Sequence, residues 1–385
     1  MSHKVLKKDF IALKHLGRGN YGQVDLVVKL RGVDKGHEYA LKRIEKGRIM
    51  HSSSLKRGIL TERDILIKLR DHPSFPGLVY AFQTRTCLYL VMEPIYGCEL
   101  FDFMNIFGTF HQDLTLFYVN QIVLMLEYLH ARGIVFRDLK PENMIVMKHN
   151  GYIRLVDFGH ARSGIYSHSQ KMTTCCGTRA YRSPEMINFK RGYTRACDWW
   201  ALGIIMYDML FGILPFDHED DKITTKLILE APLRFPTPLG LEIDDSTKEI
   251  IRLFLNREYQ SRLGAGPDDA LEVQRHPYFS SYDWERLRSR QLPFPHNEPL
   301  LVLMEKVPHV DDTIYEGNFE KTYEHFDGFD FTSPEMIEED EIRESDSSDA
   351  DGKTTARSSE SSSSNESDPF EILMFGNHKS SRHSL

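Results

Sequence analysis

The spacing of apolar residues changes near residue 95, and this change constrains the fold more than any other feature. From residue 10 to residue 50, Val, Leu and Tyr alternate with polar residues in several short runs, which is typical of half-buried strands, and Leu88–Glu93 is predicted as another strand. One stretch among them, Ser53–Arg70, has helical spacing with its apolar residues on one stripe. Beyond a joint at Met92–Gly97, long stretches such as Leu114–Gly133 are helical. The pattern predicts an α+β chain, with a small sheet unit that has one main helix and a larger, mostly helical unit.

The net charge of −8 is concentrated in one segment. Residues 335–370 contain twelve acids and three bases, a charge of −9, which leaves +1 for the rest of the 385 residues. No long basic stripe is present, so a nucleic acid is not expected as a direct ligand. The acidic, serine-rich segment 335–385 cannot bury enough apolar area to offset its chain entropy, and it is predicted to be disordered. Its one apolar island, Pro369–Phe375, fits a docking peptide and a residual apolar patch equally well.

Cysteine usage and the apolar stretches bear on the compartment. Five cysteines occur without paired spacing, which favours free thiols in a reducing environment; they are Cys87, Cys98, Cys175, Cys176 and Cys197. The first ten residues lack the apolar core of a signal peptide, and the most apolar stretch, Ala201–Phe216, is too short to cross a bilayer. We expect no membrane insertion and a location in the cytoplasm, the nucleus or both.

Three glycines near the start of the sheet unit follow the pattern G-x-G-x-x-G-x-V, at Gly17–Val24. Dinucleotide-binding folds share such glycines, but there they open a helix, whereas here they lie between two strand-like runs. This context favours a β-turn-β flap over phosphates. Lys42, in the next strand, is suited to pair with those phosphates as a point charge. Glu62, in the predicted helix, is the candidate that orients this lysine, although spacing alone would assign it to a solvent-facing position.

The stretch FRDLKPEN supplies the second half of the same chemistry. Asp138 is suited to orient a hydroxyl nucleophile and to accept its proton. Lys140 would neutralise charge on a transferred phosphoryl group, and Asn143 offers a neutral oxygen to Mg²⁺. Asp157, in the sequence DFG, is the predicted second metal ligand. With the glycine pattern and the strand lysine, these residues indicate phosphoryl transfer by positioning and charge stabilisation.

These motifs, in this order, resemble those of eukaryotic protein kinases over Phe10–Phe279. RDLKPEN, and GT in CCGTRAY, resemble the Ser/Thr class rather than the Tyr class. The resemblance implies a bilobal protein kinase fold and a non-specific Ser/Thr protein kinase that uses ATP and Mg²⁺, with a small antiparallel-sheet N-lobe and a larger, mostly helical C-lobe. The implied boundaries are a short extension at 1–9, a kinase domain at 10–280 with lobes at 10–93 and 98–280, a C-terminal tail at 281–334 and the acidic segment at 335–385.

The resemblance also assigns a nucleotide site. The nucleotide-binding residues that it implies are Gly17, Gly19, Tyr21, Gly22, Val24, Ala40, Lys42, Met92, Glu93, Ile95, Glu99, Ile145 and Asp157. Val24, Ala40 and Ile145 would enclose the adenine, although core packing alone would also explain Val24 and Ala40. Backbone groups of Glu93 and Ile95 would bind the adenine edge, next to Met92 as gatekeeper. The implied catalytic residues are Lys42, Glu62, Asp138, Lys140 and Asn143, and the metal ligands are Asn143 and Asp157.

Protein substrates with basic residues are implied in the same way. Glu99, Glu142 and Asp208 match acids that hold arginines two and three residues before the acceptor. We therefore predict a kinase that prefers Ser or Thr with upstream Arg or Lys. Thr178 would contact the catalytic Asp and Lys of FRDLKPEN.

The sequence RAYRSPE departs from its relatives. Arg179 and Arg182 stand where a proline and an apolar residue usually shape the pocket for the residue after the acceptor. We predict that this pocket disfavours large apolar side chains and tolerates acids. Two internal pairings are implied as well: Glu185 with Arg262, and Asp198 with the catalytic loop.

Several segments resemble the AGC group of kinases, namely DWWALG, FRDLKPEN and YDWERLRSRQLPFP. LTERDIL and YAFQT resemble the N-terminal kinase domain of mitogen- and stress-activated kinases and of ribosomal-protein kinases, whose second kinase domain is absent from this sequence. Residues 326–331 resemble the AGC hydrophobic motif, and Phe326, Phe329 and Phe331 would dock beside the helix of Glu62. Asp330 stands at the usual phosphorylation site, so the tail is predicted to dock without phosphorylation; a disordered aromatic tail is the alternative.

Thr174 matches the activation-segment phosphorylation site of this group, which implies an upstream activating kinase. A phosphate there would add a charge of about −1.5 to −2 and bind Arg137, with Arg162 as a second candidate. Gly58 stands where the helix often supplies a histidine partner, so this clamp is predicted to be weaker. The adjacent Thr173 leaves the register of the site open.

Two other functions fit parts of the sequence. A pseudokinase or scaffold would bind nucleotide without catalysis, but the full set of catalytic residues is present. A small-metabolite kinase would not need the GT and SPE sequences or the tail, which organise a peptide site. Short motifs at Ser333, Ser348 and Ser363 fit phosphorylation sites, but motifs of this kind are frequent by chance.

Overall fold

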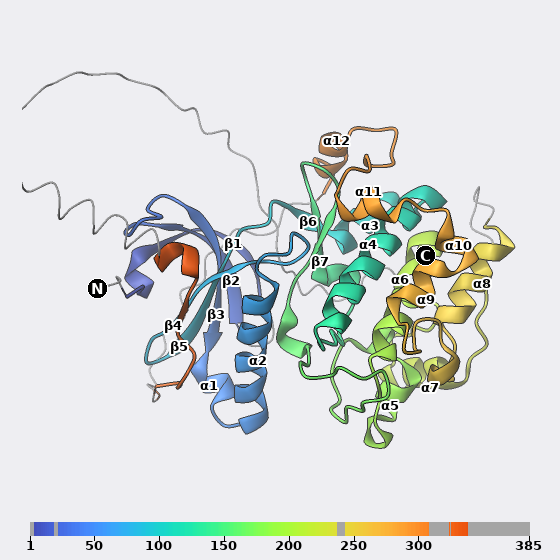
Figure 1. The fold of residues 1–385 in the computed structure, drawn as a ribbon, viewed down its shortest axis with the longest axis horizontal. Coiled ribbons are helices and arrows are strands. Elements are labelled where there is room, and N and C mark those ends of the chain that lie inside the picture. Colours follow the sequence, from blue (N-terminus) through green and yellow to red (C-terminus); the bar gives the residue numbers. More distant parts are fainter. Residues whose placement is uncertain (1–3, 19–21, 237–242, 308–322, 324, 338–385) are drawn as a thin grey trace, which may run out of the picture. The chain divides into compact units, whose positions relative to one another are not determined.

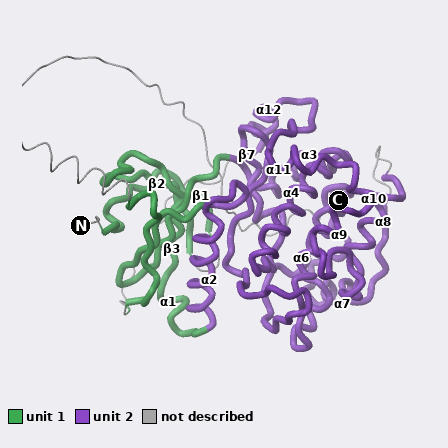
Figure 2. The backbone as a smooth tube through the Cα atoms, in the orientation of Figure 1, with its two compact units in different colours: residues 1–53, 77–96, 310–376 green, residues 54–76, 97–309, 377–385 purple. Residues whose placement is uncertain are grey.

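The computed structural model describes residues 4–18, 22–236, 243–307, 323 and 325–337. It contains two compact units (Figure 2): unit 1 comprises residues 1–53, 77–96 and 310–376, and unit 2 comprises residues 54–76, 97–309 and 377–385. Unit 1 is rich in strands and unit 2 in helices (Figure 1), so the predicted α+β organisation is confirmed. The predictions for Gly19, Tyr21, Ser348, Ser363 and the acidic segment beyond Ile337 concern positions outside the described residues.

Unit 1 is built on a six-stranded antiparallel sheet with the order β1-β2-β3-β5-β4-β9. Its strands are β1 Phe10–Arg18, β2 Gly22–Lys29, β3 Glu38–Glu45, β4 Leu78–Gln83, β5 Cys87–Met92 and β9 Phe331–Thr332. A 3-10 turn, η1 (Lys7–Asp9), precedes β1, and the short helix α1 (Lys46–Ile49) follows β3.

The two faces of this sheet serve different purposes. Val24 pairs with Lys42 and Lys42 with Leu90, while Ala40 pairs with Met92. Because paired residues and residues two apart share a face, the side chains of Val24, Ala40, Lys42 and Met92 lie on one face. The opposite face carries a buried cluster of Tyr39, Leu41, Tyr80, Phe82, Tyr89 and Val91, against which Phe10 and Met336 pack.

Unit 2 is a helical body with a small three-stranded sheet in the order β6-β7-β8. Its strands are β6 Gly97–Glu99, β7 Met144–Met147 and β8 Ile153–Leu155. Its α-helices are α2 Ser53–Leu69, whose first residue belongs to unit 1, α3 Leu100–Phe107, α4 Gln112–Ala131, α5 Pro184–Ile187, α6 Ala196–Phe211, α7 Asp221–Glu230, α8 Asp245–Phe254, α9 Ala270–Arg275, α10 Pro277–Ser280, α11 Trp284–Arg288 and α12 Leu300–Met304. Its 3-10 turns are η2 Pro141–Asn143, η3 Phe158–His160, η4 Arg179–Tyr181, η5 Phe189–Arg191 and η6 Tyr259–Ser261.

The helix α6 forms the centre of unit 2, because every one of its residues is buried. A helix that is apolar on all sides is expected in such a position. It contains two acids, Asp198 and Asp208, at 1% and 2% exposure. Buried carboxylates are costly unless they are hydrogen-bonded, so these two positions mark polar tasks inside the core.

Helix ends in unit 2 follow the expected local chemistry. The carboxylate of Asp244 caps α8 by accepting a hydrogen bond from the backbone N–H of Thr247 at 2.6 Å. Gly133, with φ of 68°, follows α4 and turns the chain toward the FRDLKPEN stretch. The loop after α2 is tied to β8, because the N–H of Leu155 donates to the carbonyl of Ser74 at 2.9 Å.

All five cysteines lie among the described residues and are free thiols, as predicted. In the described part of the chain, no helix combines the length and apolar character needed to cross a membrane.

Candidate active site

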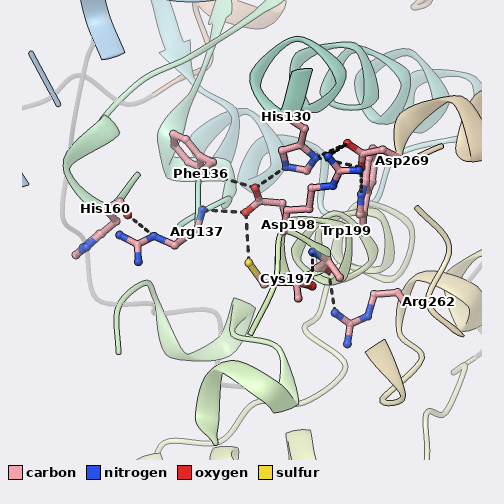
Figure 3. A network of polar contacts seen from close by, with 12 residues as sticks. His130, Phe136, Arg137, His160, Cys197, Asp198, Trp199, Arg262 and Asp269 are labelled. Carbon is pink, nitrogen blue, oxygen red and sulfur yellow. Dashed lines mark hydrogen bonds and ion pairs between the residues drawn. The ribbon is translucent and has the colours of Figure 1, made fainter. Parts of the chain in front are cut away.

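The catalytic loop begins directly after α4 and is held by hydrogen bonds from its backbone. The N–H groups of Phe136 and Arg137 donate to the carboxylate of Asp198, at 2.9 and 2.8 Å (Figure 3). Arg137 adopts φ of 69°, a conformation that non-glycine residues rarely take. Asp198 therefore fixes the chain immediately before Asp138, as predicted.

Asp138 is nearly buried, at 5% exposure, and each of its carboxylate oxygens has partners. Oδ1 accepts hydrogen bonds from the backbone N–H and the hydroxyl of Thr178, at 2.7 and 2.8 Å. Oδ2 accepts from Nδ2 of Asn143 at 3.3 Å and lies 3.8 Å from Nζ of Lys140. The predicted contact of Thr178 with Asp138 is confirmed.

Gly177 allows the activation segment to approach this loop. Its φ is 79°, and a Cβ at this position would lie 2.5 Å from the carbonyl oxygen of Arg137. Only glycine tolerates both the conformation and the distance. The following residue, Thr178, can therefore reach Asp138 from a different part of the chain.

The backbone of Asn143 is hydrogen-bonded to the residue that precedes Asp157. The N–H of Val156, the residue before Asp157, donates to the carbonyl of Asn143 at 2.8 Å. Nδ2 of Asn143 donates to the carbonyl of Asp138 at 2.8 Å, which directs the amide oxygen away from that bond. Asp157 has φ of 60°, and its Oδ1 accepts the N–H of Gly159 at 3.3 Å.

These two side chains fit Mg²⁺. One carboxylate and one amide oxygen form a hard oxygen donor set, and Mg²⁺ usually takes few protein ligands and completes its shell with phosphate and water. Among the described residues, no group of three or more His, Cys, Asp or Glu side chains is arranged to hold a metal ion. The donor set of Asn143 and Asp157 suits a cation that also takes phosphate oxygens as ligands.

Glu62 and Lys42 belong to different units. Glu62, on α2, is buried at 2% exposure, and its Oε2 would lie 3.7 Å from a Cβ placed on Gly159. The solvent-facing position that spacing alone assigns to Glu62 is therefore wrong. Lys42 lies on β3 of unit 1. The pairing of the two side chains stays a prediction.

The predicted adenine-binding residues are mostly core residues of their own unit. In unit 1, Ala40 is fully buried and Val24, Met92 and Ile95 are 4%, 3% and 2% exposed. In unit 2, Ile145 on β7 is fully buried and pairs with Glu99 on β6. Gly17 pairs with Val24, at the β1 side of the glycine loop, and Gly22 opens β2. The exposed Glu93 donates its N–H to the carbonyl of Gly77 at 3.0 Å.

Comparison with known proteins decides the family. A family model described as "Protein kinase domain" matches residues 10–279 of this chain. The chain belongs to this family.

Several curated relatives of this chain are ribosomal protein S6 kinases. Ribosomal protein S6 kinase alpha-6 of Danio rerio is 40% identical over 286 residues, which cover 74% of this chain and 37% of the relative. Ribosomal protein S6 kinase alpha-3 of Homo sapiens is 39% identical over 283 residues, covering 74% and 37%. Ribosomal protein S6 kinase 2 beta of Xenopus laevis is 35% identical over 354 residues, covering 88% and 54%. The predicted resemblance to ribosomal-protein kinases of the AGC group is confirmed, and the chain spans about a third to a half of the length of these relatives.

The activation segment of this kinase domain is held around Thr174. The hydroxyl of Thr174 accepts a hydrogen bond from Nη1 of Arg137 at 2.7 Å, and the hydroxyl of Tyr193 donates to the Thr174 carbonyl at 2.8 Å. Thr173 and Thr174 are both exposed. Arg162 is exposed too, and its backbone bridges Val135. Arg137 is thus already placed to meet a phosphate on Thr174.

The predicted pairing of Glu185 with Arg262 is confirmed. Nη1 and Nη2 of Arg262 donate to the two carboxylate oxygens of Glu185 at 2.6 and 2.9 Å, and Arg262 is 1% exposed. Nη1 also donates to the carbonyl of Ala196 at 2.8 Å, which links this pair to the start of α6. A bidentate pair of this kind fixes geometry as well as charge.

The acids predicted to recognise substrate arginines lie on separate elements. Glu99 ends β6, Glu142 lies in η2, and Asp208 lies on α6. The strand β6 packs beside η2, so Glu99 and Glu142 are on neighbouring elements. Glu99 and Asp208 are 5% and 2% exposed, and Glu142 is half-buried.

Arg179 and Arg182 both have partners of their own. Nη1 of Arg179 forms an ion pair with Asp221 at 2.6 Å, in which both side chains are accessible to solvent. Nε of Arg182 donates to the carbonyl of Gly177 at 2.9 Å. Arg182 is therefore fixed to the activation segment, whereas Arg179 is held by a surface pair.

The tail of this chain docks on unit 1. Phe326 and Phe329 are buried at 6% and 0% exposure, and β9, which begins at Phe331, pairs with β4 at the edge of the sheet. Gln83 accepts a hydrogen bond from the N–H of Phe326 at 2.7 Å and donates to its carbonyl at 3.0 Å. Asp330 accepts from Nε2 of Gln83 at 3.3 Å. The disordered-tail alternative is wrong for residues 325–337, whereas docking beside α2 stays a prediction.

Ser333, predicted as a proline-directed phosphorylation site, is 4% exposed, and its N–H donates to the carbonyl of Val79 at 2.8 Å. A second kinase would reach this hydroxyl only after the segment leaves the sheet. Phosphorylation of Ser333 stays a prediction.

Four residues with clear tasks in this arrangement were given no role in the sequence analysis. Tyr193 and Gln83 bind backbone groups of the activation segment and the tail. His130 contacts Asp198 through one ring nitrogen and Asp269 through the other (Figure 3). Only the positive φ of 50° at Asp269 marks an unusual position, and a φ value is not visible in a sequence.

Proposed function

We propose that this chain is a Ser/Thr protein kinase that transfers the γ-phosphate of ATP to Ser or Thr hydroxyls. One observation carries the proposal: Asp138 is buried and its carboxylate is fixed by contacts with Thr178, Asn143 and Lys140. This is the arrangement that phosphoryl transfer by positioning requires.

Asp138 acts on the acceptor hydroxyl. Its Oδ1 accepts two hydrogen bonds from Thr178, whereas Oδ2 accepts only one long bond, from Asn143, so Oδ2 is the oxygen that orients the hydroxyl and accepts its proton. Lys140, 3.8 Å from that oxygen, supplies positive charge beside the transferred group. Asn143 and Asp157 hold Mg²⁺, which when bound neutralises charge on the phosphates.

We assign ATP binding to the residues that the protein kinase family implies. Gly17, Gly19, Tyr21 and Gly22 cover the phosphates, and Lys42 pairs with them and is oriented by Glu62. Val24, Ala40, Met92 and Ile145 enclose the adenine, and backbone groups of Glu93 and Ile95 bind its edge. The sheet register supports this assignment, because Val24, Ala40, Lys42 and Met92 share one face.

Protein substrates carry arginine or lysine before the acceptor. Glu99, Glu142 and Asp208 are the acids that hold these cations. The burial of Glu99 and Asp208 supports the assignment, because a buried carboxylate gains more from a cation than an exposed one does. Replacing each acid with its amide should weaken the preference for arginine at one substrate position.

The residue after the acceptor lies near Arg179. The surface pair of Arg179 with Asp221 is worth about 0–1 kcal/mol, so a substrate acid can replace Asp221 as its partner. We expect acids to be tolerated and large apolar residues to be disfavoured at this position. A peptide array with a strong preference for Leu or Phe there would contradict the assignment.

Activity rises when an upstream kinase phosphorylates Thr174. The hydrogen bond of its hydroxyl to Arg137 becomes a charge-assisted pair, and Arg137 is bonded by its backbone to Asp198. The phosphate therefore holds Arg137, the residue that precedes Asp138, more firmly in place.

The tail docks without phosphorylation. Asp330 contacts Gln83 and lies 3.8 Å from Nζ of Lys4, so a negative charge is present at that position from the start. The C-terminal tail and the phosphorylated Thr174 then act together as the activating features. Unchanged activity and tail docking in Asp330→Ala would remove this part of the proposal.

The test is phosphate transfer from Mg·ATP to an oriented Ser/Thr peptide library, with the chain phosphorylated at Thr174 and Asp138→Asn as control. We expect incorporation into peptides with upstream arginine, which is lost in the variant. If ATP binds but no peptide is phosphorylated, the chain is a nucleotide-binding scaffold instead.

A further inference from the structure

Asp269 has a rare backbone conformation, and both oxygens of its carboxylate have partners. It precedes α9 with φ of 50° and ψ of −122°, a region that glycine favours, and it is 9% exposed. Its carboxylate contacts three side chains from other elements. These contacts are Nδ1 of His130 at 3.0 Å, Nε1 of Trp199 at 2.8 Å and Nη1 of Arg195 at 3.4 Å.

His130, on α4, lies between two carboxylates (Figure 3). Its Nδ1 faces Asp269, and its Nε2 faces Oδ2 of Asp198 at 3.0 Å. An ionised carboxylate only accepts hydrogen bonds, so both ring nitrogens must carry a proton. The geometry therefore requires the imidazolium form of a side chain that has no exposure to solvent.

Asp198 transmits this arrangement to the catalytic loop. The oxygen that faces His130 also accepts the N–H of Phe136, and the other oxygen accepts the N–H of Arg137. A continuous series of hydrogen bonds thus runs from Asp269 through His130 and Asp198 to the two residues before Asp138.

The charges in this cluster balance. Asp198 and Asp269 are negative, and His130 and Arg195 are positive. Cys197 is a further titratable neighbour, with its Sγ 3.9 Å from Asp198, and burial raises the pKa of its thiol well above the usual range, so it stays neutral. If His130 lost its proton, two buried carboxylates would share one arginine, which is costly.

We propose that Asp269 is a positioning residue for phosphoryl transfer, which acts by keeping His130 as the cation that holds Asp198 against the catalytic loop. Of the two tests below, only the measurement of kcat rests on the proposed kinase activity. In agreement with it, burial alone would lower the pKa of His130, but Asp269 and Asp198 outweigh burial and raise this pKa to about 9.

The test compares Asp269→Asn with Asp269→Gly and a control. Asn keeps the size of the side chain and tolerates a positive φ but carries no charge. Gly suits the backbone best, so it remains informative if the Asn variant folds poorly. The matched control is Asp268→Asn, because Asp268 is the adjacent acid and forms an exposed pair with Arg275 at 3.2 Å.

The first readout is NMR of the whole chain, which needs no activity. In both Asp269 variants, we expect the pKa of the His130 imidazolium to be at least about one unit lower than in the parent. We also expect the amide protons of Phe136 and Arg137 to exchange faster at pH about 8.5, where the ring is then neutral. An unchanged titration of His130, or unchanged exchange of both amides, would overturn the proposal.

The second readout is the ratio of variant to parent kcat as pH rises. A ratio near one at pH about 6.5 that falls about threefold by pH about 8.5 is expected, since lowering a pKa of about 9 by one unit reduces the charged fraction at that pH about threefold. A ratio that is independent of pH would mean that Asp269 is merely structural. An inactive parent would contradict the proposed function instead, and the NMR readout would still decide the role of Asp269.

Discussion

At the residue scale, the site depends on contacts between residues that are far apart in the sequence. Asp138 is fixed by Thr178, forty positions later, and the backbone before it is fixed by Asp198. The motif residues could be predicted because each carries its own chemistry. Tyr193, Gln83 and Asp269 could not, because a tyrosine, a glutamine or an aspartate acquires such a role only from its tertiary partner.

Gly177 gives the first prediction. In Gly177→Ala, the Cβ would lie 2.5 Å from the carbonyl of Arg137, so Thr178 must move away from Asp138. We expect kcat on a peptide to fall at least about tenfold and the unfolding free energy to fall by about 1–3 kcal/mol.

The matched control for Gly177 is Gly164→Ala. Gly164 also has a positive φ, of 85°, but an added Cβ meets no atom within 4 Å. It should lose similar stability and keep its kcat. Equal kcat losses in the two variants would show that the close approach of Gly177 has no role in catalysis.

His130 gives a prediction about stability and pH. Its pKa is raised from 6.5 to about 9 in the folded chain, mainly because Asp269 and Asp198 outweigh burial. The stabilisation is therefore complete below pH 6.5 and is lost as pH rises to about 9. Urea unfolding should show the parent losing about 3 kcal/mol more than His130→Asn across this range. Parallel pH profiles of the two proteins would contradict the raised pKa.

At the element scale, strands with alternating polar residues could be predicted and β4 could not. Four of the six residues in Leu78–Gln83 are buried and the other two are half-buried, so the strand shows no period of two. The helices α2 and α4 could be predicted from their spacing, to within a few residues at each end. The small β6-β7-β8 sheet was missed because strands of three or four residues leave too short a pattern.

The pairing of β9 with β4 gives a prediction about the stability of the docked tail. Gln83 makes two hydrogen bonds to the backbone of Phe326, so Gln83→Ala should destabilise the docked tail by about 1–3 kcal/mol. Hydrogen exchange should then show reduced protection of the amide of Ser333, which donates to the carbonyl of Val79. The control is Asp327→Ala, an exposed acid of the same segment. Full protection of Ser333 in Gln83→Ala would mean that β9 docks independently of this side chain.

At the scale of the whole molecule, the order of motifs predicted the family and the two kinds of unit. It could not predict which contacts the tail makes, because those depend on an exposed sheet edge and on Gln83. The described contacts of the tail end at Ile337.

Two truncations test whether the docked tail stabilises the folded chain. Ending the chain after Ile337 removes none of the described contacts and should leave the Tm unchanged within about 2 °C. Ending it after Val307 also removes β9 and the buried Phe326 and Phe329, and should lower the Tm by at least about 4 °C. Equal Tm values for the two truncations would contradict the account of the docked tail.

The central claim is that Asp138 orients the acceptor hydroxyl for phosphoryl transfer. The most direct measurement is single-turnover transfer from Mg·ATP to an arginine-containing Ser peptide, by the Thr174-phosphorylated chain and by Asp138→Asn, with ATP affinity measured in parallel. The account predicts that the variant binds ATP as the parent does and transfers phosphate at least about a hundredfold more slowly. Equal transfer rates, or no transfer by the parent with ATP bound, would contradict it.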